Sequence, residues 1–522
     1  MPKIGVLIVG AGPAGLATAI ALKRSGYPGR VVVLEKGRRV SNHSLSGAVV
    51  DPAGFEDLLN EDEIAKLPIG SMVAKESFRF LFSPHASVKI PWVPPMMRAK
   101  GYPIISLAKL VRYLAEIATK LGAEVYPSFA AVETIEENGC IVGVRTGDKG
   151  VDSNGNKKDG YLASEEVRAK IVILAEGAAG VLTGKVADKY QLNGCRPQSY
   201  ALGIREVLEL NDPDEGRAGE IMHTFGFPVD SCTYGGGFVY HLDKRHIAVG
   251  FAVGLDYHDS RLDPYALFQR YKESSLIAAH IKDAKVVSYG AKLIPEGGWY
   301  ALMRPYAPGA LIVGDNAGLV DGLRIKGVHI ALESGVAAAK AILGGDEGIG
   351  ERYFELLKAT RGYREIKRVR NVHGGFSYNA LFGVVQAGLA WVTFGRFPFW
   401  MVGSKKCDAK SIKELGRDDQ HEGRSVLLGQ KLLDDVYLSG VVHEENQPSH
   451  IRLRDAEKCA ECMQRFGAPC LVFCPGAVYR REGERIAIEF SNCLHCHTCS
   501  DKCPFGNVEW NFPEGGGGPK YD

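Results

Sequence analysis

The placement of cysteine constrains this chain more than any other feature of its sequence. Twelve cysteines occur in 522 residues, and eight of them fall in one short segment near the C-terminus. The eight are Cys459, Cys462, Cys470, Cys474, Cys493, Cys496, Cys499 and Cys503. The last four follow the spacing C-x2-C-x2-C-x3-C-P, which binds 4Fe–4S clusters in small bacterial electron carriers. The first four repeat this pattern with a longer second gap, so the segment predicts a ferredoxin-like iron–sulfur domain.

The expected ligand sets follow from this pattern, because the fourth cysteine of each run binds the cluster of the other run. One 4Fe–4S cluster is predicted on Cys474, Cys493, Cys496 and Cys499. A second is predicted on Cys459, Cys462, Cys470 and Cys503. Paired C-x2-C motifs also bind structural zinc, but zinc does not explain two Cys-Pro endings. The longer gap leaves open a three-iron cluster, or none, in the second set. His495 and His497 are expected to shape the cluster surroundings rather than to bind iron.

The N-terminal segment has the pattern of a dinucleotide-binding unit. An apolar strand over residues 4–10 leads into Gly10-x-Gly12-x-x-Gly15, which opens an apolar helix. A second strand follows and ends at Glu35. The glycines permit a tight turn at the helix N-terminus, where a pyrophosphate can approach the backbone, and Glu35 can accept hydrogen bonds from a ribose. The alternative is a plain βαβ unit with small residues for packing, which this full context disfavours.

Two later segments favour FAD over NAD as the cofactor. A strand within residues 310–318 ends at Gly314-Asp315, and an acid placed there suits the ribityl chain and pyrophosphate of a flavin. Another strand ends at Glu176-Gly177 and is expected to join the same sheet. No second G-x-G-x-x-G follows a strand, so a pyridine-nucleotide site is not expected. The wide separation of these segments predicts a nucleotide-binding domain that is interrupted by insertions.

Charge and the N-terminus limit the cellular setting. The formal net charge of +2 gives no indication of nucleic-acid binding. The first apolar run is short and enters a glycine-rich turn, so we expect a strand rather than a signal peptide. The remaining cysteines are scattered, which is typical of a reducing compartment. These observations favour a prokaryotic protein on the cytoplasmic side, or a processed one.

Two apolar segments indicate contact with a lipid surface. Residues 377–402 are almost free of charge, contain Gln386, and are interrupted by Gly395 and Pro398. A basic run over residues 358–370 precedes them, and a second apolar piece spans residues 90–97. Basic residues beside an apolar, aromatic helix are typical of a segment that lies in the membrane interface. A buried core helix with a domain-contact loop is the alternative, and a transmembrane span is disfavoured by the interruptions.

The chain also resembles a known family, electron transfer flavoprotein–quinone oxidoreductase, over nearly its whole length. The matching segments occur in one order along the chain, which makes the resemblance more specific than any single motif. They are GAGPAGLATAI, LSGAVVDP, AEGAAG, TYGGGFVYHL, VGFAVGLDY, YGAKLIPEGG, IKGVHIALESG, LSGVVHEENQPSHIRL, CPGAVY, CLHCHTC and NFPEGGGGPKY.

This resemblance implies a glutathione-reductase-like FAD domain interleaved with a quinone-binding domain, and a C-terminal ferredoxin-like domain. The FAD domain is then expected at residues 1–74, 105–202 and 286–375. The quinone-binding and membrane-contact domain is expected at 75–104, 203–285 and 376–402, and a linker with the cluster domain at 403–522. The quinone contact of the family falls on Gly235 and Gly236, which without the resemblance read as turn or bulge glycines.

The resemblance also implies the reaction. Reduced electron transfer flavoprotein would deliver electrons to FAD and 4Fe–4S, and these would reduce ubiquinone or menaquinone at the cytoplasmic face of a membrane, without a catalytic side chain. Mitochondrial-type members carry one cluster, on Cys474, Cys493, Cys496 and Cys499, so the other four cysteines are a departure. The alternatives are an FAD-dependent isoprenoid reductase or hydroxylase, and an electron-relay subunit of a bifurcating flavoprotein complex.

Overall fold

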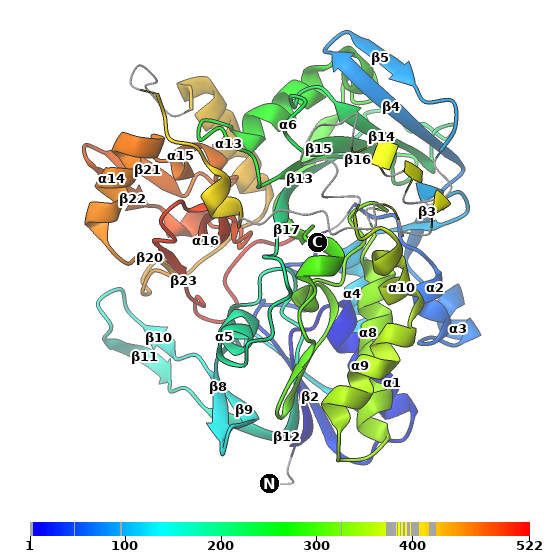
Figure 1. The fold of residues 1–522 in the computed structure, drawn as a ribbon, viewed down its shortest axis with the longest axis vertical. Coiled ribbons are helices and arrows are strands. Elements are labelled where there is room, and N and C mark those ends of the chain that lie inside the picture. The colour runs from blue at the N-terminus through cyan, green and yellow to red at the C-terminus, as the bar shows by residue number, and fades with distance from the viewer. Residues whose placement is uncertain are drawn as a thin grey trace.

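A computed structural model of the chain describes residues 4–45, 47–93, 97–324, 326–371, 407–416 and 424–521, together with single positions between 383 and 397. Two large sheets and one small cysteine-rich module make up these parts (Figure 1). The first sheet lies in the lower half of Figure 1, the second lies in the upper half, and the module flanks both on the left.

The first sheet is parallel at its centre, with the order β7-β2-β1-β12-β19 and β18 at one edge. Its strands are β1 (Ile4–Val9), β2 (Arg30–Glu35), β7 (Glu124–Pro127), β12 (Glu166–Leu174), β18 (Tyr306–Ala307) and β19 (Ala310–Ile312). An antiparallel hairpin of β8 (Ala131–Glu137) and β9 (Cys140–Thr146) extends from the start of β12. The predicted strands at the glycine-rich turn, at Glu176 and at Asp315 therefore all belong to one sheet, as expected.

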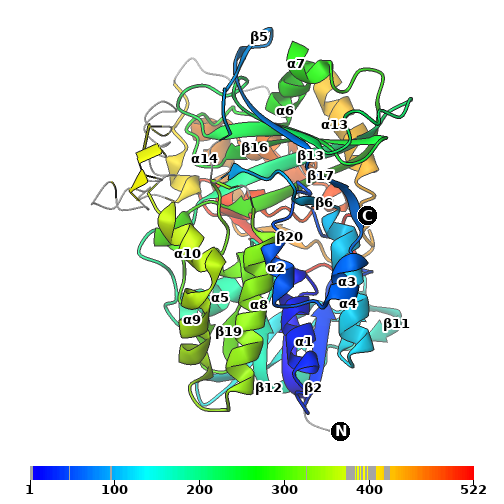
Figure 2. The ribbon, with the colours of Figure 1, turned by 90° about the vertical axis from the view of Figure 1, so that its right-hand side faces the viewer.

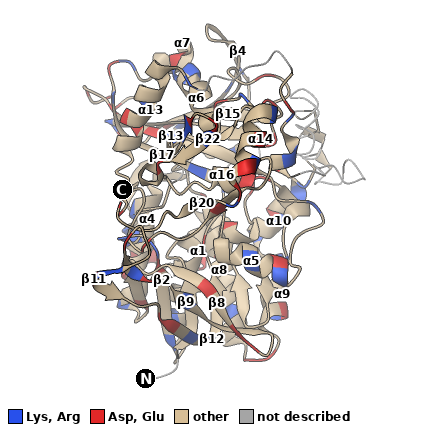
Figure 3. Ribbon diagram, turned by 90° about the vertical axis from the view of Figure 1, so that its left-hand side faces the viewer, with Lys and Arg blue, Asp and Glu red and all other residues tan. Residues whose placement is uncertain are grey.

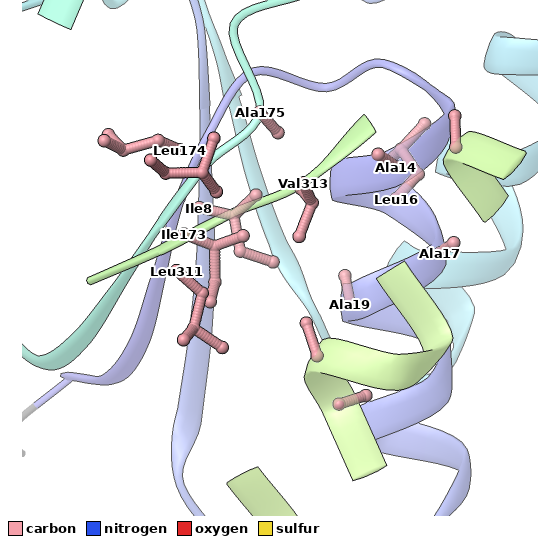
Figure 4. Close-up of a cluster of buried hydrophobic side chains, with 14 of the residues drawn as sticks. Ile8, Ala14, Leu16, Ala17, Ala19, Ile173, Leu174, Ala175, Leu311 and Val313 are labelled. Atoms are coloured by element: carbon pink, nitrogen blue, oxygen red, sulfur yellow. The ribbon is translucent and has the colours of Figure 1, made fainter. Parts of the chain in front are cut away.

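Helices cover this sheet because its strands are apolar on both faces. Helix α1 (Pro13–Arg24) packs against α8 (Val328–Leu343), and alanines of α1 lie against Ile8, Ile173 and Leu311 of the sheet (Figure 4). A Cβ added to Gly335 of α8 would lie 2.3 Å from the Ala14 carbonyl oxygen. The two helices thus approach each other through small residues. Helices α4 (Leu107–Lys120) and α9 (Ile349–Ala359) complete the layer.

The second sheet has seven strands in the order β17-β13-β16-β15-β14-β4-β5. They are β4 (Lys75–Ser83), β5 (Ala86–Lys89), β13 (Tyr200–Glu209), β14 (Glu220–Gly226), β15 (Gly235–His241), β16 (His246–Gly254) and β17 (Lys285–Pro295). All neighbours are antiparallel except β14 and β4. Strand β17 pairs with β13 along its full length, from Tyr200↔Pro295 to Glu209↔Lys285. The chain therefore returns to the first sheet only after Pro295, later than the boundary expected at residue 286.

The cysteine-rich module is built from two short antiparallel ribbons and three short helices. The ribbons pair β20 (Ile451–Leu453) with β23 (Val508–Trp510), and β21 (Tyr479–Glu482) with β22 (Arg485–Ile488). The helices are α14 (Ala456–Phe466), α15 (Cys470–Phe473) and α16 (Thr498–Lys502). Leu494 and Cys496 of this module pack into the apolar cluster of the second sheet, together with Leu432 and Val436 of α13 (Val426–Leu438).

Smaller elements complete the fold (Figure 2). They are α2 (Ala53–Glu56), α3 (Glu61–Ala65), β3 (Ile69–Met72), β6 (Pro103–Ile105), β10 (Lys149–Val151), β11 (Lys157–Leu162), α5 (Val181–Lys189), α6 (Pro264–Glu273), α7 (Ser275–Ala278), α10 (Arg361–Arg368) and the 3-10 turns η2 (Gly298–Ala301), η3 (Gly314–Ala317), η4 (Asp408–Ser411) and η5 (Phe490–Asn492). Among the described residues, no helix is both long enough and apolar enough to cross a bilayer. Charges of both signs are interspersed on the side drawn in Figure 3.

Candidate cofactor, quinone and iron–sulfur sites

The glycine-rich turn lies between β1 and α1, and its three glycines have different surroundings. Gly10 has a φ of +107°, and an added Cβ would lie 2.3 Å from the Ala175 carbonyl oxygen. A Cβ on Gly15 would lie 2.2 Å from the Gly10 carbonyl oxygen, so Gly15 allows close packing of helix and strand. At Gly12 nothing lies within 4 Å of an added Cβ. Gly12 therefore leaves an open cradle at the N-terminus of α1, where the first backbone N–H groups have no intrahelical partner.

Glu35 lies at the end of β2, beside this turn. Its carboxylate accepts a hydrogen bond from the Ala11 N–H at 3.0 Å and another from the Gly37 N–H at 2.7 Å. These bonds fix the carboxylate at the edge of the cradle while each oxygen keeps a free lone pair. The position suits the ribose contact predicted from the sequence, and that contact stays a prediction.

Glu176 and Gly177 follow β12, and here the structure adds a role that the sequence did not indicate. The Glu176 carboxylate accepts hydrogen bonds from the N–H groups of Leu182 and Thr183 and from the Thr183 hydroxyl, at 2.8–3.1 Å. It thereby satisfies the first turn of α5, whose N-cap Gly180 has no side chain. Gly177, with a φ of +84° and open space around its Cα, faces the cavity described below.

Asp315 lies in the turn after β19, on the same edge of the sheet. Burial raises the pKa of Asp315 to about 6, and the Lys292 ammonium opposes this rise. The preceding Gly314 has a φ of +67°, and its N–H donates to the Ser334 hydroxyl of α8 at 2.9 Å. The turn is therefore held rigidly against α8, with the Asp315 carboxyl facing the cavity.

A single cavity of about 1660 Å³ joins these segments to the second sheet and to the cysteine-rich module. Its volume exceeds the ~300–1,000 Å³ typical of a site for one small ligand. Seven of the eight predicted nucleotide-site residues line it, and Gly15 lies beneath it; the seven are Gly10, Gly12, Glu35, Glu176, Gly177, Gly314 and Asp315. The residues fit FAD because the cradle at Gly12 is empty of side chains and the cavity has room for a second ligand beyond the dinucleotide.

Gly235 and Gly236 begin β15 and line the far part of the same cavity. An added Cβ on Gly235 would lie 2.9 Å from the Ala252 carbonyl oxygen, and one on Gly236 would lie 2.6 Å from that of Thr224. The strand register continues from Gly236 through Ala252 and Gly203 to Lys292. All four of these residues line the cavity, so its floor is a cross-strand row of small residues that ends in a buried lysine.

Sequence reasoning did not identify Lys292. It occurs in an ordinary alternating strand, and only the register of β17 on β13 brings it to the cavity. Burial and the nearby Lys36 ammonium lower the pKa of Lys292 to about 8, whereas the Cys496 thiol and the acids Glu35 and Asp315 oppose that shift. Lys292 therefore lies between the predicted flavin acid and a predicted cluster ligand.

The end of the cavity remote from the nucleotide turn has an apolar, exposed rim. Phe82 of β4 is 66% exposed and Trp92 is 65% exposed, and both line the cavity. The exposed residues Val385, Leu389 and Val392 belong to the predicted apolar segment. Most of that segment, residues 377–402, lies outside the described residues, as do residues 94–96. Gly388, which is described, lines the same cavity.

The eight clustered cysteines form two groups in space, and all are free thiols. The first group contains Cys474, Cys493, Cys496 and Cys499, all buried. The pKa of Cys474 is raised to about 11 by burial and by the Cys496 thiol, and that of Cys499 is raised by burial and by Cys496, Cys493 and Cys474. Four buried sulfurs that raise one another's pKa in this way form a donor set that suits a 4Fe–4S cluster.

The second group contains Cys459, Cys462, Cys470 and Cys503, which line a separate small cavity. The two groups have the same members as the two ligand sets expected from the spacing. Along the chain, however, Cys474 follows cysteines of the second group and Cys503 follows cysteines of the first. Polar groups also lie beside sulfurs of the first group: the His495 backbone N–H donates to Cys493 Sγ at 3.4 Å, and the Thr498 hydroxyl lies 3.3 Å from Cys496 Sγ. Such hydrogen bonds adjust the potential of a bound cluster.

His495 and His497 both have left-handed backbone, with φ values of 53° and 66°. The side chains of His497 and Trp510 form the cavity wall beside the first cysteine group. The His497 and Trp510 rings lie 4.0 Å apart, and both line the cavity. His495 Nε2 lies 2.8 Å from Nε2 of His443, whose Nδ1–H donates to the Ser491 carbonyl oxygen at 2.9 Å. Both histidines lie beside the first cysteine group, and their influence on a bound cluster stays a prediction.

Comparisons with known proteins agree with this arrangement. Residues 8–57 match the model of an NAD(P)-binding Rossmann-like domain, residues 200–294 match "ETF-QO, ubiquinone-binding", and residues 427–522 match "Electron transfer flavoprotein-ubiquinone oxidoreductase, 4Fe-4S". The first range contains the glycine-rich turn, the second covers β13 to β16 and nearly all of β17, and the third contains the cysteine-rich module. The middle range ends at residue 294, next to the end of β17 at Pro295.

Solved structures share the fold at low sequence identity. A geranylgeranyl bacteriochlorophyll reductase-like protein of Thermoplasma acidophilum aligns with a TM-score of 0.56 at 18% identity, over 78% of this chain and 94% of that one. The flavin-dependent brominase Bmp2 aligns, as a triple mutant, with a TM-score of 0.52 at 16% identity, over 76% and 95% of the two chains. Both share the overall fold of most of this chain.

Curated relatives are much closer in sequence. The electron transfer flavoprotein-ubiquinone oxidoreductase of Pseudomonas aeruginosa is 36% identical, and the alignment covers 99% of this chain and 98% of that protein. The probable mitochondrial enzyme of Schizosaccharomyces pombe is also 36% identical, over 99% of this chain and 85% of that one. Because identity at this level extends over the nucleotide turn, the second sheet and the cluster module alike, the chain belongs to the electron transfer flavoprotein–ubiquinone oxidoreductase family.

Proposed function

We propose that this chain oxidises reduced electron transfer flavoprotein and reduces a membrane quinone, with FAD and 4Fe–4S as its redox groups. Family membership supports this reaction. The observation that supports it most directly in this chain is a cavity shared by the three predicted sites. The nucleotide cradle, the Gly235–Gly236 edge and the inner wall of the cluster module all face one continuous cavity. A two-electron carrier, a one-electron carrier and a lipid-soluble acceptor can therefore sit side by side without solvent between them.

The proposed FAD contacts are the predicted residues of the first sheet. Gly10, Gly12 and the N-terminus of α1 would hold the pyrophosphate, Glu35 the adenosine ribose, and Asp315 the ribityl chain. Glu176 acts through the backbone, because its carboxylate already caps α5. When bound, FAD accepts and releases electrons singly or in pairs, whereas a 4Fe–4S cluster carries one electron at a time. The chain itself supplies position, electrostatics and exclusion of water.

The proposed quinone contact is the backbone at Gly235 and Gly236. The small side chains of Gly203 and Ala252 leave the cavity floor flat beside it, so a planar head group can lie against the strands. Both ubiquinone and menaquinone present carbonyl oxygens to such a backbone. The named relatives make ubiquinone the acceptor that we propose first. The quinone-binding domain then comprises the second sheet, with residues 75–104, 376–402 and the strands β13–β17.

The proposed membrane contact is the apolar rim of this cavity. Phe82, Val88 and Trp92 project from or near the β4–β5 hairpin with 49–66% of their surface exposed. Val385, Leu389 and Val392 add exposed apolar surface from the predicted interfacial segment. A quinone that is dissolved in one leaflet could then enter the cavity without crossing water. We propose a monotopic attachment of this rim on the cytoplasmic side of the membrane.

A quinone-dependent turnover assay tests this function. The holoprotein is mixed with chemically reduced electron transfer flavoprotein and with vesicles that contain long-chain ubiquinone, and donor oxidation is followed spectroscopically. Ala252→Leu places bulk beside Gly236, and we expect it to raise the KM for quinone about tenfold or more while donor-driven bleaching of the flavin is kept. Ala163→Leu, at an exposed site after β11, is the matched control. Donor oxidation that is independent of quinone in the parent chain would indicate a relay subunit and refute the proposal.

A further inference from the structure

Four cysteines remain outside the function proposed above, and the structure gathers them into one site. Cys459 and Cys462 lie on α14, Cys470 is the first residue of α15, and Cys503 follows α16. The four sulfur-bearing side chains line a single small cavity that is closed by apolar residues, among them Phe473, Ile486 and Phe505. Side chains from three helices converge here, although the sequence separates the first and last of them by more than forty positions.

The site carries the polar features of a thiolate centre. The Asn507 side-chain N–H₂ donates to Cys459 Sγ at 3.1 Å, and the Asn507 backbone N–H donates to Cys503 Sγ at 3.3 Å. Asn507 also donates to the Asp455 carbonyl oxygen at 2.6 Å, which holds the amide in this orientation. Asn507 therefore contacts two of the four sulfurs that line this cavity.

The two cysteine runs of the module are built in the same way. Each cysteine run ends in Cys-Pro, each is followed by an antiparallel ribbon strand, and each contributes its fourth cysteine to the opposite group. Tyr479 connects the two groups, because it lines the second cavity and packs in one apolar cluster with Cys474 and Cys499 of the first group. The two sites are therefore neighbours within one small module.

The two sites differ in their access to the rest of the molecule. All four cysteines of the first group are buried, and the histidine–tryptophan wall beside them lines the flavin and quinone cavity. No cysteine of the second group lines that cavity among the described residues, and three of the four are partly exposed. Helix α14, which carries two of them, lies on the outer margin of the module (Figure 1).

We infer that Cys459, Cys462, Cys470 and Cys503 hold a second 4Fe–4S cluster, and that this outer cluster is the site where electrons from the flavoprotein donor enter the chain. The inference rests on the proposed function for the identity of the donor and the acceptor. The reduced flavin of the donor would give up two electrons, one at a time, and would release its protons to water. The two cysteine groups would hold the clusters through which each electron passes. The quinone takes up both electrons with two protons from water and becomes quinol, so charge and atoms balance.

The first test counts metal in the holoprotein. Iron, acid-labile sulfide, zinc and FAD are measured in anaerobically purified chain, and the dithionite-reduced protein is examined by low-temperature EPR. Two 4Fe–4S clusters predict about eight irons and about eight sulfides per FAD, with an EPR spectrum broadened by coupling between two reduced clusters. About four irons with zinc, about four irons alone, or about seven irons with a signal in the oxidised protein would each overturn the assignment.

The second test removes the outer site alone. Cys462→Ser is expected to lower the iron content by half and to leave the uncoupled EPR spectrum of one cluster, with FAD content unchanged. The rate at which reduced electron transfer flavoprotein bleaches the flavin should then fall at least tenfold. Cys195→Ser, an exposed cysteine outside the module, is the matched control and should keep the parent spectrum.

The two tests separate the inference from the proposed function. An undiminished donor-driven rate in a Cys462→Ser chain that has lost half of its iron would refute the entry role. A parent chain that binds eight irons and fails to reduce quinone would refute only the proposed function. The iron count of the parent chain does not depend on the folding of any variant.

Discussion

The glycines of the nucleotide turn differ in what surrounds their Cα atoms. This difference distinguishes glycines that the fold requires from a glycine that leaves space for a ligand. Gly10 and Gly15 are enclosed by backbone atoms, whereas Gly12 has open space on the cavity side. Gly12 also has a φ of −80°, which any residue adopts without strain. The turn itself therefore does not require glycine at this position, and the open space suits the predicted ligand.

Gly12→Val is expected to abolish FAD binding without unfolding the chain. The new side chain would occupy the cradle at the N-terminus of α1, so purified protein should lose its yellow flavin absorbance while its melting temperature matches that of the apo parent. Gly15→Val is the comparison, because its Cβ would strike the Gly10 carbonyl oxygen and cost about 1–3 kcal/mol or more of stability. A Gly12→Val chain with normal flavin content would contradict the assignment of the cradle.

Asp315 should make the stability of the apo chain depend on pH in an unusual direction. Its pKa is about 6 in the fold, because of burial, and lies near 3.9 in an unfolded chain. Between these values the folded state holds the extra proton, so its stabilising contribution is complete below about pH 4 and is lost as the pH rises through 6. The shift corresponds to about 3 kcal/mol.

Denaturant unfolding of the FAD-free chain from pH 4 to 7 measures this effect. Asp315→Asn should remove the corresponding fall in unfolding free energy relative to the parent chain. Asp212→Asn, at an exposed position, should leave the parent profile in place. Parallel profiles for the parent and Asp315→Asn would show that the carboxyl titrates normally.

At the scale of elements, α16 attaches the cluster module to the second sheet through one buried ion. Lys502, the last residue of α16, is fully buried, and its ammonium donates hydrogen bonds to the carbonyl oxygens of Leu255, Tyr257 and Asp408. The ammonium also lies 3.9 Å from the centre of the Tyr257 ring. All three of its protons have acceptors, so the buried charge is compensated by geometry rather than by a single counter-ion.

Lys502→Met is expected to loosen this attachment. The substitution leaves three buried carbonyl oxygens without their donor, each at a cost of about 1–3 kcal/mol. Hydrogen exchange should become faster at residues 255–257 and in η4, while exchange in the first sheet stays slow. Lys410→Met, at an exposed position of η4, is the control. Unchanged protection in Lys502→Met would show that other contacts hold the module.

Over the whole molecule, three parts meet around one cavity, and the C-terminal tail joins them. The Gly516 N–H donates to the Lys36 carbonyl oxygen at the end of β2, and the buried Tyr521 reaches Ala291 of β17. The tail thus spans the first sheet, the module and the second sheet. At the opposite side, the exposed aromatic residues Phe82 and Trp92 mark the open rim.

The paired substitution Phe82→Ser and Trp92→Ser should weaken binding to quinone-containing vesicles. Burial of each aromatic side chain in lipid contributes about 1.5–3 kcal/mol, so the partition coefficient measured by vesicle co-sedimentation should fall at least a hundredfold for the pair. Leu162→Ser changes an equally exposed apolar residue on β11 and should leave binding unaltered. Equal losses for both sites would indicate non-specific adsorption instead of a membrane-contact rim.

A feature of this molecule can be predicted from sequence when the residues that determine it lie close together along the chain. It cannot be predicted when those residues meet only through tertiary packing. The strand–glycine turn–helix unit at Gly10, the strand that ends at Glu35 and the grouping of cysteines by spacing depend on residues within a few turns of chain. The boundary after β17 was missed because alternation in residues 285–295 fits either sheet, and only pairing with β13 selects the second. Glu176 was predicted as a cofactor contact, yet its carboxylate caps α5 seven residues later.

The flavoprotein fold, the family and the iron–sulfur chemistry can be predicted from the sequence without the structure. Short-range spacing and an ordered series of motifs are sufficient to indicate them. The tertiary structure alone decided that Lys292 lies between Asp315 and Cys496, that Lys502 anchors the module, and that the second cysteine group faces outward. Those arrangements arise from strand register and domain packing, in which residues hundreds of positions apart become neighbours, and no local pattern carries that information.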